Sequence, residues 1–89
     1  MPITLETIDE TTFKVTVADR TTTTHTVTVS PEYREKLTGG GVPAEKLVEK
    51  SFEFLLERES NTSILRTFDL PMIQRYFPEY EKTIRTMLK

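Results

Sequence analysis

Residues 43–59 read PAEKLVEKSFEFLLERE, and they form the strongest structural signal in the chain. Apolar side chains recur there at the three- and four-residue spacing of one face of an α-helix. Phe54 widens this face to an arc of about 200°, which is more than a helix resting on one surface needs. We therefore expect two surfaces to cover the helix, either a sheet and another helix or a sheet and a second subunit. Arg58 falls on the same arc, where it either ends the apolar face or pairs with a carboxylate at an interface.

The residues before this helix have the character of β-strands. Eleven of the first thirty residues are threonine, a β-branched residue that favours strands. Apolar and polar residues alternate over 3–8, 12–18 and 23–30, which predicts three strands in an antiparallel meander. The first of these stretches fits either a strand or a loose N-terminal arm. The threonine-rich face is expected to lie in solvent and the Phe/Val face against the helix.

A short helix and a glycine linker are predicted over 31–42. Ser30 can cap the helix, and Pro31 suits its first turn. Gly39 is well placed to end it, because glycine is preferred just past a helix end. Gly39, Gly40 and Gly41 then form a flexible connection to the main helix, which we predict over 43–60.

Residues 61–89 are predicted to form short C-terminal helices. One further turn is expected from Thr62 to Phe68, with Leu65 among its apolar contacts. Asp69 is a candidate N-cap for a helix over 70–76. The inner face of that helix is expected to carry Met72, Ile73, Tyr76 and Phe77. Pro78 should break it and open an amphipathic terminal helix.

These segments predict one α+β domain over residues 1–89. Its sheet, formed by residues 1–30, is expected to be small and antiparallel, with two or three strands. One long helix packs on that sheet, followed by the short C-terminal helices. The chain has no cysteine, its net charge is -2, and no apolar run is long enough to cross a membrane. A protein of the cytoplasm, with no membrane association, is the expectation.

Few residues offer catalytic chemistry. His25, the one histidine, has the parity of the inward-facing valines, and the sequence places neither a nucleophile nor an orienting carboxylate beside it. The glycines at 39–41 precede a helix but lack the lysine and hydroxyl of a phosphate-binding loop. We therefore expect no catalytic residues, no cofactor and no metal site, and a protein that is not an enzyme.

The leading hypothesis is a small non-enzymatic module that binds an unidentified protein partner or a second copy of itself. The over-wide apolar arc motivates it. Ser51, Phe54 and Arg58 are the residues that we expect at the edge of the contact surface.

The alternative hypothesis is a nucleic-acid-binding regulator. Residues 27–37, VTVSPEYREKL, followed by a turn and a helix, resemble the opening of ribbon-helix-helix repressors. The resemblance implies a strand that pairs with its copy in a second subunit and enters the DNA major groove. In this chain that strand would present Thr26 and Thr28. Arg66, Arg75 and Arg85, which alternate with aromatic residues, are the other candidate nucleic-acid contacts.

A second resemblance covers much of residues 43–80. The stretches SFEFLLERE (51–59), ILR (64–66), FDL (68–70) and YFPEY (76–80) are similar to a group of small bacterial proteins of uncharacterised function. The resemblance implies a bacterial cytoplasmic protein and carries no activity with it.

Overall fold

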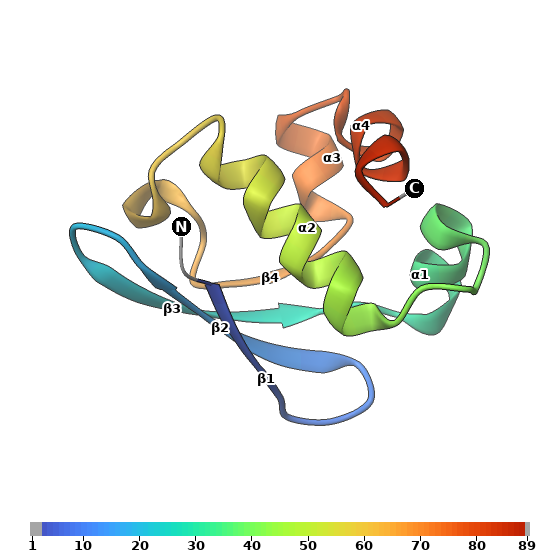
Figure 1. The fold of residues 1–89 in the computed structure, drawn as a ribbon, viewed down its shortest axis with the longest axis horizontal. Helices are drawn as coiled ribbons and strands as arrows, with labels where there is room; N and C mark the ends of the chain where they lie inside the picture. Colours follow the sequence, from blue (N-terminus) through green and yellow to red (C-terminus); the bar gives the residue numbers. More distant parts are fainter. Residues whose placement is uncertain (1–2, 89) are drawn as a thin grey trace.

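The structure is a computed structural model that describes residues 3–88; residues 1, 2 and 89 of the predicted domain lie outside this range. Within it, a mixed sheet of four strands and four α-helices form an α+β fold, which confirms the predicted class. The helices lie on one side of the sheet and leave its other face uncovered (Figure 1).

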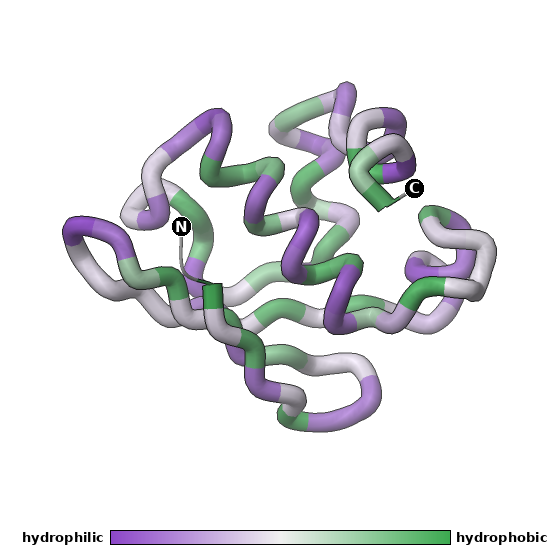
Figure 2. The backbone as a smooth tube through the Cα atoms, viewed as in Figure 1, coloured by the Kyte–Doolittle hydropathy of each residue, from purple (hydrophilic) through white to green (hydrophobic). Residues whose placement is uncertain are grey.

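The first three strands form the predicted antiparallel meander. Strand β1 spans Ile3–Thr7, β2 spans Thr12–Ala18 and β3 spans Thr22–Thr28, so the N-terminal stretch is a strand and not a loose arm. The alternation of apolar and polar residues is visible along these strands in Figure 2. It turns Phe13, Val15, Val17 and Val27 into the core. The threonines between them fill the uncovered face, as the pattern predicted.

A fourth strand extends the sheet beyond the predicted two or three. Strand β4, Thr67–Asp69, pairs parallel to β3 and gives the strand order β1-β2-β3-β4. The prediction of a helical turn over 62–68 was wrong: only Asn61–Ser63 forms a short 3₁₀ turn (η1), and the chain then extends. The outer edge of β3 explains the difference, because its backbone groups bond to the passing chain at Arg66 and Leu70.

Helix α1, Pro31–Thr38, has the predicted ends. The Ser30 hydroxyl accepts a hydrogen bond from the Tyr33 amide at 3.1 Å. Gly39 ends the helix at φ 74°, a left-handed conformation that glycine adopts without strain, and its amide donates to the carbonyl of Glu35.

The central helix α2 is shorter than predicted. It spans Ala44–Leu56, thirteen residues, where the pattern suggested 43–60. Its last turn carries no basic residue, while Glu57 and Glu59 place carboxylates near the negative end of the helix dipole. The amides of both Arg58 and Glu59 donate to the carbonyl of Leu55, which closes the helix in a tight turn.

Two layers of the same chain cover α2. The sheet packs on one side, and the C-terminal helices α3 (Met72–Tyr76) and α4 (Tyr80–Met87) pack on the other (Figure 1). The Phe54 ring lies edge-on to the rings of Tyr80 and Phe77, at 5.2 and 5.8 Å between centroids. Of the two arrangements that the wide arc allowed, the chain uses a sheet and another helix.

Helix α3 begins later than predicted. Asp69 ends β4 and caps no helix, since the residue at the N-cap of α3 is Pro71 and no side chain caps it. None of the helices described over residues 3–88 is long and apolar enough to cross a membrane.

Candidate functional site

An apolar groove of about 340 Å³ lies between the end of α2, the chain that enters β4, and α3. Its floor is formed by the buried side chains of Leu55, Phe68 and Ile73. Its walls are mostly apolar, from Ile64, Leu65, Met72, Tyr76 and Phe77. Two polar residues, Glu59 and Ser63, complete the lining. We call this site the α2–α3 groove.

The floor of the groove belongs to the main core, so its position is fixed. Phe68 is the inward-facing residue of β4, and its ring lies 6.1 Å from the ring of Phe52 in α2. Phe52 in turn lies 5.4 Å from the His25 ring on β3. The groove is thus seated on an aromatic row that joins the helix to the two strands below it.

The wall residue Leu65 owes its orientation to His25. The imidazole is buried on the inner face of the sheet, where its sequence parity placed it. Its Nδ1 lies 2.8 Å from the Leu65 carbonyl oxygen, and because a carbonyl only accepts, Nδ1–H is the donor. In the neutral ring Nε2 then accepts from the Thr23 hydroxyl, at 2.8 Å. Turning its carbonyl inward leaves the Leu65 side chain 46% exposed.

Asn61 anchors the same segment one turn earlier. Its side-chain amide is buried and donates to the Thr21 carbonyl at 2.7 Å and to the Thr23 hydroxyl at 3.0 Å. Asn61 and His25 therefore meet at Thr23, and together they hold the chain that enters β4 against β3. Every buried side-chain nitrogen and oxygen described over residues 3–88 has a hydrogen-bond partner.

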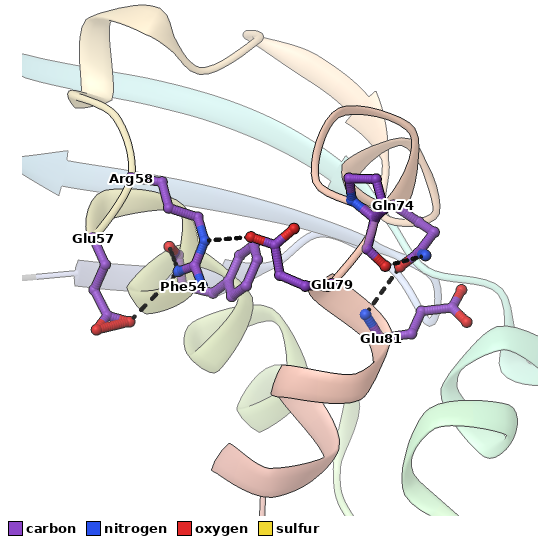
Figure 3. A network of polar contacts seen from close by, with 7 residues as sticks. Phe54, Glu57, Arg58, Gln74, Glu79 and Glu81 are labelled. Atoms are coloured by element: carbon purple, nitrogen blue, oxygen red, sulfur yellow. Dashed lines mark hydrogen bonds and ion pairs between the residues drawn. The ribbon is translucent and has the colours of Figure 1, made fainter.

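Tyr76, from α3, also lines the groove and is 64% exposed. We predicted it on an inner face, and this was wrong because α3 stops after five residues and Phe77 turns into an extended conformation. The corner that follows is fixed by Gln74 (Figure 3). Its side-chain amide donates to the Pro78 carbonyl, and its oxygen accepts from the Glu81 amide in α4.

Glu59 is the charged residue of the groove. Its side chain is partly buried among apolar neighbours, and this burial raises the pKa of its carboxyl above the usual value. Among residues 3–88 we find no hydrogen bond or ion pair to this carboxylate. The groove therefore offers an apolar floor with one uncompensated negative charge at its rim.

The three residues predicted at the edge of a contact surface, Ser51, Phe54 and Arg58, do not line this groove. Ser51 and Phe54 are fully buried under α4, so the apolar arc on which we expected a partner is covered within the chain. The Ser51 hydroxyl donates to the Leu47 carbonyl and meets the Tyr80 hydroxyl at 2.6 Å. Of the three predicted residues only Arg58 reaches solvent.

Arg58 seals the exposed side of this contact (Figure 3). Its guanidinium lies 3.6 Å from the centre of the Phe54 ring and donates to the Phe54 carbonyl. Its Nε donates to the Glu79 carboxylate at 3.2 Å. The predicted pairing with a carboxylate is therefore present, but it joins α2 to the residue that precedes α4 in the same chain.

The candidate nucleic-acid contacts lie on several elements of the fold. Thr26 and Thr28 lie on β3, and the Thr26 amide donates to the Arg66 carbonyl beside it. Arg75 and Arg85 lie on two other elements, α3 and α4. Strand β3 is bonded on both edges, to β2 and β4, so a ribbon shared between two subunits would require it to give up one neighbour.

Over residues 3–88 there is no group of three or more His, Cys, Asp or Glu side chains that could hold a metal ion. Comparison of the chain with protein-family models, with curated proteins and with solved structures found no match. The α2–α3 groove was not foreseen from the sequence; the pair Ile64-Leu65, of which only one can face the core of an extended chain, was the available signal.

Proposed function

We propose that the protein is a small non-enzymatic interaction module and that the α2–α3 groove is its contact surface for a protein partner. The observation that carries this proposal is the exposure of Leu65 and Tyr76, which both line one apolar groove. Contiguous exposed apolar surface beside a hollow is typical of protein and ligand contact sites.

The walls have the composition of a contact surface. Tyrosine is enriched among the residues that contribute most to binding at protein interfaces, and it loses little conformational entropy when it is buried. The apolar floor beneath it gives a partner's side chain a place to be desolvated. With the apolar arc of α2 already covered by α4, this groove replaces that arc as the site at which we expect the partner.

The test is a pull-down from a bacterial cytoplasmic lysate, the source that the resemblance of residues 51–80 implies. We expect a stoichiometric protein to bind the unaltered chain and to be lost with the double variant Leu65→Ser/Tyr76→Ser. The matched control is Ile8→Ser, because Ile8 is equally exposed (54%) but lies in the turn after β1, away from the groove. Circular dichroism should show all three chains folded.

The outcomes of the pull-down distinguish a protein partner from nucleic acid and from a second copy of the chain. Recovery of the same partner by the groove variant would contradict the proposal. Material that binds only without nuclease treatment would instead support the nucleic-acid alternative, with Thr26, Thr28 and the three arginines as its contacts. Sedimentation of the purified chain shows whether the partner is a second copy.

A further inference from the structure

Strand β4 has a free outer edge beside the groove. The Thr26 amide bonds to the Arg66 carbonyl, and the Leu70 amide bonds to the Thr28 carbonyl, at 2.6 and 2.9 Å. In a parallel pair every second residue of a strand bonds to its neighbour. Arg66 and Leu70 bond to β3, so Phe68, midway between them, also directs its amide and carbonyl to β3. The amides and carbonyls of Thr67 and Asp69 consequently point away from the sheet. Among the described residues no hydrogen bond to them is found.

The groove and this edge share one residue, since Phe68 is both the centre of β4 and part of the groove floor. A strand laid along β4 would direct every second side chain to the helix side of the sheet, where the groove lies. Side chains on that side would meet apolar walls and one carboxylate, that of Glu59.

We infer that the partner segment binds as an added β-strand on the outer edge of β4, with an apolar side chain between Leu65 and Tyr76 and a lysine or arginine against Glu59. This inference rests on the proposed function and names the chemistry of its partner. Strand addition supplies affinity through backbone hydrogen bonds, and the alternate side chains in the groove supply specificity.

Charge favours such a segment over a second copy of the chain. In a two-fold symmetric dimer each subunit presents the same surface to the other. The lining of the groove contains no basic residue, so a second copy that presented the same groove would bring no cation from it to Glu59. A segment with a basic residue would compensate the negative charge of Glu59. Burial disfavours this charge and raises the pKa of the carboxyl, so a neighbouring cation would stabilise the carboxylate.

The experiment is selection from a random peptide display library, run in parallel on the unaltered chain, on Leu65→Ser/Tyr76→Ser, on Glu59→Gln and on the control Glu57→Gln. Glu57 is exposed and lies outside the groove lining. We expect enriched peptides to alternate apolar and polar residues and to contain a lysine or arginine. They should bind about tenfold more weakly to Glu59→Gln and equally well to Glu57→Gln. In NMR titrations the amide signals of Thr67 and Asp69 should move.

Four results would overturn the inference. One is enrichment without a basic residue or without dependence on Glu59. Another is binding that leaves the Thr67 and Asp69 amide signals unmoved, and the third is enrichment no greater than that on Leu65→Ser/Tyr76→Ser. In the first two cases, peptides that still need Leu65 and Tyr76 would leave the proposed function standing. In the third case, if the groove variant still loses the partner in the pull-down, the proposed function stands and only strand addition is refuted. Self-association through the groove would replace the partner with a second copy and also refute the inference.

Discussion

Replacing Ser51 by alanine is expected to destabilise the protein more than replacing Tyr80 by phenylalanine, although both changes remove the same contact. The Ser51 hydroxyl has one proton, which it donates to the Leu47 carbonyl at 2.7 Å. The Tyr80 hydroxyl, 2.6 Å away, must therefore be the donor to Ser51. Both side chains are fully buried, and the same burial raises the pKa of Tyr80.

The magnitudes follow from what each variant leaves behind. Ser51→Ala strands a buried tyrosine hydroxyl, which costs about 1–3 kcal/mol, and regains about 0.5 kcal/mol of helix propensity. Tyr80→Phe loses one hydrogen bond, worth about 1 kcal/mol, while Ser51 stays bonded to Leu47. The double variant strands no donor, so we expect it to cost about 1 kcal/mol in total and not the sum of the two.

Urea unfolding followed by far-ultraviolet circular dichroism would measure the free energy of unfolding of all four chains in this cycle. In a domain of 89 residues each kcal/mol also moves the melting temperature by about 4–8 °C. Additive effects of Ser51→Ala and Tyr80→Phe, or a smaller effect for Ser51→Ala than for Tyr80→Phe, would refute the assignment of Tyr80 as the donor.

Three further predictions concern Glu59, Arg58 and the glycine linker. Because burial raises the pKa of Glu59, the native state holds this proton more tightly than the unfolded chain, and stability falls as pH rises through that pKa. Glu59→Gln should therefore gain less than ~0.5 kcal/mol at neutral pH and nothing near about pH 3; urea unfolding showing a loss at neutral pH would contradict this. Arg58→Ala should cost about 1 kcal/mol in thermal unfolding, and Arg58→Lys should recover less than half, because an ammonium group cannot stack flat on Phe54. Full recovery by lysine would show that charge and not stacking matters. Gly39→Ala should cost about 1 kcal/mol because Gly39 has φ 74°, whereas Gly41→Ala, with ordinary φ and open space around it, should stabilise by about 0.5 kcal/mol. Equal melting temperatures for the two glycine variants would contradict both expectations.

The sequence predicted well those elements that carry a repeating apolar pattern within their own residues. Strands β2 and β3 lie within two residues of their expected ends, because the alternation of Val and Thr sets both the strand and its buried face. Strand β4 has three residues and no such pattern. It is extended because β3 offers it an unpaired edge, and that edge becomes visible only when the sheet has been assembled.

The candidate site depends on relations between distant residues, which limits its prediction. The position of Arg58 on the apolar arc was recognised, but its partner Glu79 lies 21 residues later. Tyr76 had the spacing of an inner-face residue, and the early end of α3 turned it outward. The outward side chain of Leu65 follows from a hydrogen bond between its carbonyl and the His25 ring, 40 residues before it.

The parallel pairing of β3 and β4 also has a consequence for the nascent chain. Strands β1–β3 are made first and pair with near neighbours, but β4 is separated from β3 by the whole of α1 and α2. Until about 40 further residues have left the ribosome, the outer edge of β3 has no partner. That strand is rich in threonine, carries no proline and has high β-propensity, the features of a segment that pairs with other chains. The pairing of β4 with Thr26–Thr28 then covers part of this edge, and we expect it to lower the tendency of the chain to aggregate.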